Sequence, residues 1–135
     1  MSSFKDLRIV DNFYQTSLFF PMPTVIISTL TPDGKTTLGP YSLVQPYYVA
    51  GKDFYAMLLN CRNSSNTAQN ILRTGKCALN FIPDDRKFFK EAVKLSWPGD
   101  TPEEKMPKCS YVLEPGLRAE ADPAGEYPLV LRDAF

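Results

Sequence analysis

The sequence contains no histidine, and this absence excludes several kinds of catalytic and metal site at once. Ser-His and Cys-His nucleophile systems use an imidazole base, and histidine metal sites use an imidazole ligand. Cysteine is also scarce. Cys61, Cys77 and Cys109 are odd in number and widely spaced, which fits neither a disulfide framework nor a metal knuckle. We therefore expect no metal site and no catalytic side-chain nucleophile.

An excess of charge of either sign is missing as well. Lysine plus arginine and aspartate plus glutamate number 15 each, so no basic field favours nucleic acid or an anionic membrane as a partner. No apolar run is long enough to span a bilayer, and the start Met-Ser-Ser-Phe-Lys-Asp lacks the basic and apolar regions of a secretion signal. We expect a cytoplasmic protein.

The composition is that of a folded protein, since 44% of the 135 residues are hydrophobic, and the length suits a single domain over residues 1–135. Spacing of apolar residues predicts helices at 4–20, 62–75 and 84–95. Short apolar runs bounded by turn residues predict strands at 24–30, 35–38, 44–50, 54–60, 77–82, 111–113 and 127–131. We interpret this order as a mainly β protein with helices, an antiparallel, Greek-key-like barrel with a crossover helix packed against it.

Glycine and proline mark three places along this order. Thr31-Pro-Asp-Gly34 predicts the turn of a hairpin. Gly39 beside Pro40 predicts that the second strand ends there and that the backbone leaves the ladder. Residues 96–107 hold too many prolines for a helix and too many charges for burial, so we expect an exposed loop. It lies either near the mouth of a functional site or on the far side of the protein.

The helix expected at 62–75 has clear boundaries. Ser64 or Ser65 suits its N-cap, and Gly75 suits the position after its last turn, which contains Arg73. One face is apolar at helical spacing, formed by Ala68, Ile71 and Leu72.

The start of this helix is rich in hydrogen-bond donors. Helix N-termini carry unpaired N–H groups and a partial positive charge, which together favour an anion such as a phosphate. Capping alone explains the hydroxyl residues, whereas Arg62 adds a charge that capping does not require. The candidate phosphate-binding residues are Arg62, Ser64, Ser65, Asn66 and Thr67.

Residues 12–82 resemble the flavin reductase-like, FMN-binding split-barrel family, in its flavoredoxin-like branch. The order and spacing of four landmarks carry the resemblance. They are Phe-Pro-Met-Pro-Thr-Val-Ile-Ile-Ser-Thr at 20–29, Leu-Gly-Pro-Tyr-Ser at 38–42, Arg62 with Ser65-Asn-Thr67, and Asn70-Ile71 leading to the segment 77–81.

The resemblance implies an FMN site made from these landmarks. Ser28 and Thr29 match positions that face the flavin ring or its ribityl chain. The loop beside the isoalloxazine ring corresponds to Pro40, Tyr41 and Ser42, and the phosphate turn to Arg62, Ser65, Asn66 and Thr67. The sequence departs from the family pattern at three positions. Family members often have a basic residue in place of Met22, an asparagine in place of Thr37 and a charged residue in place of Asn66.

The resemblance also implies a function. We expect an FMN-binding oxidoreductase, an NAD(P)H-dependent flavin reductase that passes hydride from nicotinamide to flavin and on to free flavin, ferric iron or a partner. The alternatives are a non-catalytic FMN-binding or electron-carrying module and, against the charge balance, a nucleic-acid-binding barrel with exposed aromatics such as Tyr41, Tyr47 and Tyr48. No catalytic side chain is required, because the cofactor carries the chemistry.

We further expect a homodimer, because the aromatic residues near the N-terminus and at Tyr47 and Tyr48 need covering. Cys61 is expected to be a small buried hydrophobe, with a redox thiol as the alternative. Trp97 is expected to close the edge of the core, with stacking on a substrate as the alternative. The choice between NADH and NADPH and the physiological electron acceptor stay open. In the family, further strand material normally follows a segment like 127–131, which leaves open whether the native chain continues beyond Phe135.

Overall fold

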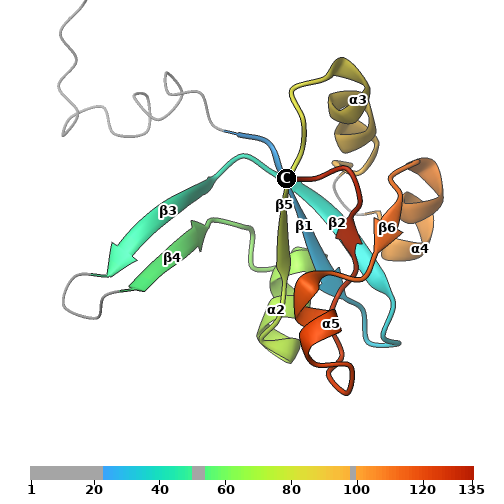
Figure 1. Cartoon of the computed structure of the whole chain (residues 1–135). Helices are drawn as coiled ribbons and strands as arrows, with labels where there is room; N and C mark the ends of the chain where they lie inside the picture. Colours follow the sequence, from blue (N-terminus) through green and yellow to red (C-terminus); the bar gives the residue numbers. More distant parts are fainter. Residues whose placement is uncertain (1–22, 50–53, 98–99) are drawn as a thin grey trace, which may run out of the picture.

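The computed structural model describes residues 23–49, 54–97 and 100–135, so the helix expected at 4–20 lies outside the described residues. The elements follow one another from β1 to β7 (Figure 1). They are β1 Val25–Leu30, β2 Thr36–Tyr41, β3 Val44–Val49, β4 Phe54–Leu59, α2 Asn66–Thr74, β5 Ala78–Phe81, α3 Arg86–Lys94, α4 Pro102–Lys105, the 3-10 helix η1 Met106–Lys108, β6 Leu113–Glu114, α5 Leu117–Ala121 and β7 Val130–Leu131.

The strands pair in three small antiparallel sheets, with strand orders β2-β1-β5, β3-β4 and β6-β7. The mixture of strands and helices and the antiparallel pairing agree with the sequence-based prediction. Among the described strands, none of the three sheets closes into a barrel.

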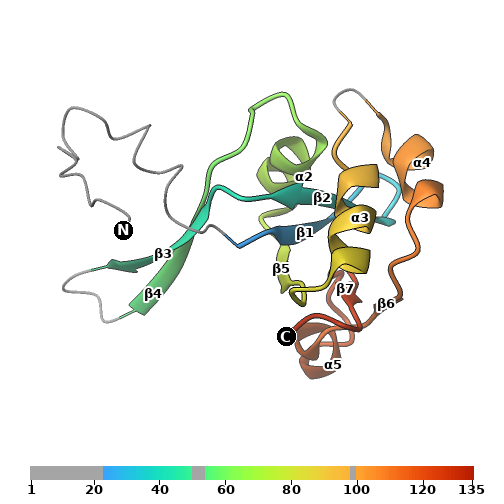
Figure 2. The same ribbon diagram turned by 90° about the horizontal axis from the view of Figure 1, so that it is seen from above.

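Strand β1 is the centre of the core, and all six of its residues are buried. Its β-branched side chains alternate between two faces, as a pleated strand requires. On one face Ile26 packs with Leu38 and with Phe88 of α3, and on the other Ile27 packs with Val44. Helices α2 and α3 therefore cover opposite faces of the same sheet (Figure 2).

The expectation that the second strand ends at Gly39 and Pro40 is wrong. Strand β2 continues to Tyr41, and Gly39 and Pro40 pair in register with Ile27 and Ile26 of β1. Strand β2 is the edge strand of its sheet and pairs on one side only, with β1. An edge strand tolerates proline, because no second strand requires the N–H that proline lacks.

Helix α2 has the boundaries that the sequence predicts. Ser65 is the N-cap and accepts a hydrogen bond from the N–H of Ala68, while Gly75 ends the helix with a φ of 67° in the left-handed region. One residue of the expected apolar face is placed wrongly, since Leu72 is 78% exposed. The buried face is instead partly polar, and Asn70 donates from Nδ2 to Thr29 Oγ1 at 3.1 Å.

The expectation of an irregular, fully exposed segment at 96–107 is also wrong. It contains α4 and the start of η1, and α4 begins with a capping box in which Thr101 and Glu104 satisfy each other's backbone N–H groups. Pro102 lies in the first turn, where proline is favoured, so it starts this helix and does not break it. Lys105 at its end is only 7% exposed.

The C-terminal region packs back onto β5. The N–H of Leu131 donates to Asn80 Oδ1 at 2.8 Å, and the N–H of Phe135 donates to the carbonyl of Phe81 at 3.1 Å. Of the extended piece expected at 127–131, only β7 pairs with another strand, and helix α5 was not expected. These contacts fasten the end of the described chain to the central sheet.

The hairpin of β3 and β4 extends away from the rest of the protein (Figures 1 and 2). Val44 and Leu59 pair at the base of the hairpin, and both pack in the core cluster of Val25 and Ile27. Three large apolar side chains near this base are exposed: Leu43 to 48% of its surface, Met57 to 38% and Leu58 to 46%.

Candidate functional site

A cavity of about 510 Å³ lies where the end of β2, the start of α2 and the segment from α3 to α4 meet. This volume falls in the range of about 300–1,000 Å³ that is typical of small-molecule and cofactor sites. The lining residues are Gly39, Pro40, Tyr41, Arg62, Ser64, Ser65, Asn66, Thr67, Leu95, Ser96, Trp97, Asp100, Thr101 and Lys105.

Helix α2 begins at this cavity, and backbone N–H groups of its first turn are unpaired among the described residues. The Ser65 hydroxyl caps the N–H of Ala68, and the N–H of Gln69 makes the first helical bond, to the Ser65 carbonyl. Within the described part of the chain, the N–H groups of Asn66 and Thr67 have no hydrogen-bond acceptor, as the geometry of a helix start dictates. The wall therefore presents a partial positive charge and free donors.

Arg62 and Ser64 add side-chain donors to this wall. Both are exposed and line the cavity, and neither is in an ion pair or side-chain hydrogen bond with another described residue. The turn that carries them is held in place, because Gln69 donates from Nε2 to the carbonyl of Asn63 at 2.7 Å and the N–H of Ser65 donates to the carbonyl of Arg62 at 2.9 Å. A guanidinium group on an ordered turn suits a phosphate.

A second part of the lining is apolar. Pro40 and Tyr41 come from β2, Leu95 from the end of α3 and Trp97 from the segment after it. The expectation that Trp97 closes the edge of the core is wrong, since it is 68% exposed and lines the cavity. Two aromatic side chains lie beside a group of hydrogen-bond donors that can bind an anion. This combination suits a ligand that has both a flat ring and a phosphate.

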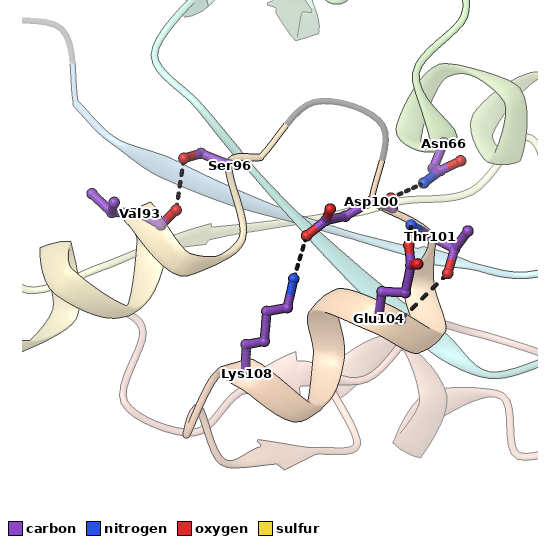
Figure 3. A network of polar contacts seen from close by, with 7 residues as sticks. All are labelled: Asn66, Val93, Ser96, Asp100, Thr101, Glu104 and Lys108. Atoms are coloured by element: carbon purple, nitrogen blue, oxygen red, sulfur yellow. Dashed lines mark hydrogen bonds and ion pairs between the residues drawn. The ribbon is translucent and has the colours of Figure 1, made fainter.

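The segment before α4 is tied to the start of α2 (Figure 3). Asn66 donates from Nδ2 to the carbonyl of Asp100 at 3.2 Å, and the Asp100 carboxylate pairs with Lys108 Nζ at 2.6 Å. The capping box of Thr101 and Glu104 then sets the direction of α4. This network holds one wall of the cavity against the other.

Gly39 permits the close approach of β2 and α2 at this cavity. A Cβ at this position would lie 2.8 Å from Thr67 Oγ1 and 3.0 Å from the ring of Tyr41. Both neighbours line the cavity, so any side chain at position 39 would displace part of its wall.

We predict that Gly39→Ala lowers the free energy of unfolding by about 1–3 kcal/mol, because Thr67 and Tyr41 must move aside. Urea unfolding measures this change, and Ser42→Ala, at an exposed neighbouring position, should stay within about 0.5 kcal/mol of wild type. An unfolding midpoint for Gly39→Ala equal to that of wild type would contradict the close packing.

The cavity brings together most of the cofactor-binding residues that the sequence predicts. They are Pro40, Tyr41, Arg62, Ser64, Ser65, Asn66 and Thr67.

Three predicted site residues lie elsewhere. Ser28 and Thr29 are completely buried in β1 and, as neighbours in a strand, point to opposite faces of the sheet. Their hydroxyls accept hydrogen bonds from Asn80 and Asn70, respectively. Ser42 is exposed beyond the end of β2 and does not line the cavity.

Of the two places expected for residues 96–107, the described part of the segment takes the first, because Ser96, Trp97, Asp100, Thr101 and Lys105 line the cavity. Sequence reasoning did not predict the helix within it. Its local signal was present, since Thr101 and Glu104 have the spacing of a capping box and Pro102 suits a first helical turn. That signal predicts a short helix but not which part of the protein the helix approaches.

The three cysteines form no disulfide among the described residues. Cys61, Cys77 and Cys109 are all free. Partial desolvation raises the pKa of the Cys77 and Cys109 thiols, so both are protonated at neutral pH and weakly nucleophilic, although Cys77 is exposed. Cys61 is half-buried and does not line the cavity.

No protein-family model matches this chain, and no curated protein sequence matches it. Across residues 23–49, 54–97 and 100–135, no helix is both long and apolar enough to cross a membrane. The same residues contain no group of three or more cysteine, aspartate or glutamate side chains placed to hold a metal ion. The interpretation of the site therefore rests on the chemistry of its own lining.

Proposed function

We propose that the protein is an FMN-binding oxidoreductase, an NAD(P)H-dependent flavin reductase whose phosphate site is the start of α2. The observation that carries this proposal is the single cavity that joins Arg62 and the open N-terminus of α2 to the aromatic side chains of Tyr41 and Trp97. FMN has the matching chemistry, because it combines a phosphate, a flexible polyol and a flat ring with an apolar face.

The donor set fits the phosphate, and the magnitude of its contribution explains why a ring site is also needed. Arg62 and two or three charge-assisted hydrogen bonds supply roughly 5 kcal/mol after ordering costs, which corresponds to binding no tighter than about 0.2 mM. Tighter binding requires burial of the ring, for which the cavity offers Pro40, Tyr41, Leu95 and Trp97.

The roles of the protein residues in this proposal are binding and orientation. FMN, when bound, supplies the hydride chemistry toward a nicotinamide donor. Arg62, Ser64 and the N–H groups of Asn66 and Thr67 hold the phosphate, and the aromatic side chains keep water from one face of the ring. No described side chain in the cavity needs to act as a nucleophile or base.

The proposal is tested by incubating the purified protein with FMN and recording its absorption spectrum, followed by anaerobic titration with NADH and with NADPH. We expect bound FMN with a perturbed spectrum that bleaches with at least one of the two donors. Bound FMN that neither donor reduces would favour the non-catalytic electron carrier. A protein that remains colourless after removal of free FMN would contradict both functions.

We also propose that the fold is a split barrel. Two copies of the protein associate, and the second copy covers the first at the β3–β4 hairpin. The support is the set of exposed apolar side chains near the base of that hairpin, Leu43, Met57 and Leu58. Apolar surface of this kind on an extended hairpin is covered in most soluble proteins by a neighbouring chain or element. The aromatic residues of the N-terminal region that suggested the dimer lie outside the described residues.

We predict a homodimer in size-exclusion chromatography with light scattering and a shift to monomer for Leu58→Glu, because a buried carboxylate at an apolar interface is strongly unfavourable. Leu72→Glu is the matched control, since Leu72 is 78% exposed on α2 and should leave the dimer intact. A wild-type monomer that binds FMN tightly would contradict the proposed assembly but not the phosphate site.

A further inference from the structure

Lys105 is an unusual residue in the cavity because it is buried and has no partner in the described part of the chain. It lies at the end of α4, is 7% exposed and lines the same cavity as Arg62. Among the residues that the structure describes, none forms an ion pair or a hydrogen bond with its amine. Lysine is rarely buried to this extent without a partner.

The local charges do not compensate this amine. Burial lowers the pKa of Lys105, an effect that Asp100 opposes only in part. The Asp100 carboxylate is already paired with Lys108 at 2.6 Å. A buried ammonium group that lacks a partner is costly, so the burial of Lys105 favours an anion that none of the described residues supplies.

Lys105 and Arg62 line the same cavity, and their combined charge indicates what kind of anion this is. The two residues come from segments far apart in the sequence, and the bond from Asn66 to the Asp100 carbonyl holds these segments together. Arg62 and Lys105 carry two positive charges, and a phosphate monoester carries about −1.5 to −2 at neutral pH. The combined charge of Arg62 and Lys105 therefore balances the charge of one phosphate monoester better than the charge of Arg62 alone.

We propose that Lys105 binds the same phosphate group as Arg62 and the start of α2, so that α2 and α4 hold one phosphate monoester between them. This inference rests on the proposed function and adds to it a phosphate-binding residue that lies outside residues 12–82. The segment around α4 then has a role in ligand affinity, and not only in access to the cavity.

The test is the affinity of Lys105→Met for FMN and for riboflavin, which has the same ring but no phosphate. Methionine preserves the length and apolar stem of lysine and removes its charge. We expect FMN to bind about tenfold more weakly and riboflavin to bind within about twofold of wild type. Lys90→Met, at an exposed position on α3 away from the cavity, is the matched control and should change neither affinity.

The double variant Arg62→Ala with Lys105→Met shows whether one phosphate is shared. Groups that hold the same anion are coupled, so the combined loss in FMN affinity should differ from the product of the two single losses. Losses that multiply without coupling would show that Lys105 and Arg62 act independently and do not share one phosphate, which would overturn the proposal. Equal losses for FMN and riboflavin would overturn it as well.

Urea unfolding without ligand separates a binding role from a structural one. Removing a buried, unpaired charge should leave the unfolding midpoint of Lys105→Met equal to or above that of wild type. A lower midpoint would indicate that Lys105 supports the fold and would overturn the proposal.

The proposed function and this inference fail in different ways. If wild type binds FMN and Lys105→Met binds it equally well, only the inference fails. If wild type binds neither flavin, the proposed function fails, and stabilisation of the protein by inorganic phosphate becomes the readout. Stabilisation of wild type that is reduced in Lys105→Met supports a phosphate site of another ligand, and equal or absent stabilisation in both overturns the inference.

Discussion

Replacing Arg62 with alanine should weaken FMN binding at least about tenfold, a loss of roughly 1.4 kcal/mol, and leave riboflavin binding nearly unchanged. The physical reason is that Arg62 contributes a cation to the cavity wall that carries the free N–H groups of Asn66 and Thr67. The helix cap is preserved, because Ser65 and not Arg62 accepts the hydrogen bond from Ala68. Charge reversal by Arg62→Glu should weaken FMN binding by about a hundredfold, since it adds repulsion to the lost attraction.

The comparison of the two flavins makes this prediction specific to the phosphate. Fluorescence titration measures both affinities, and Arg86→Ala is the control because Arg86 is an exposed arginine on α3 that does not line the cavity. Equal losses for FMN and riboflavin would show that Arg62 contacts the ring or supports the fold, and the phosphate assignment would then be wrong.

Replacing Asn80 with alanine should lower the free energy of unfolding by about 2–4 kcal/mol. Asn80 is 2% exposed and joins three segments: its Nδ2 donates to the carbonyl of Ile26 and to Ser28 Oγ, each at 2.8 Å, and its Oδ1 accepts from the N–H of Leu131 at 2.8 Å. The substitution leaves buried polar groups without a partner and opens a cavity, and both effects destabilise the protein.

Urea unfolding measures this loss, with Asn60→Ala at an exposed position as the control. A change below about 1 kcal/mol for Asn80→Ala would contradict the role of this network. The same network assigns Ser28 to the core, so Ser28→Ala should lower stability and leave flavin affinity unchanged. A loss of affinity for FMN and riboflavin alike in Ser28→Ala would instead support the ring contact that the family resemblance implies.

Elements whose causes are local were predicted well. The turn at Gly34, where φ is 78°, and the cap residues Ser65 and Gly75 all follow from conformational preferences of single residues. Strand β1 follows from a run that is rich in β-branched residues. The candidate residues of the proposed phosphate site lie together at the cavity for the same reason, because a helix start with its donors is itself a local structure.

Features that depend on neighbouring segments were predicted less well. Gly39 and Pro40 resemble a strand end, but β2 lies at the edge of its sheet, and an edge strand tolerates proline. Ser28 and Thr29 were assigned together to one site, although adjacent strand residues face opposite sides and each hydroxyl here has an asparagine partner.

By itself, the sequence determined the lack of histidine, the antiparallel strands and the position of a donor-rich helix start. Only the tertiary structure decided what that helix start faces. Asn66 and Asp100 are 34 residues apart, and their contact depends on how α2 and α3 pack on opposite faces of β1 and β2, which no local preference specifies. The burial of Lys105 follows from the same packing, because a short charged helix is exposed by composition and becomes buried only where other elements cover it.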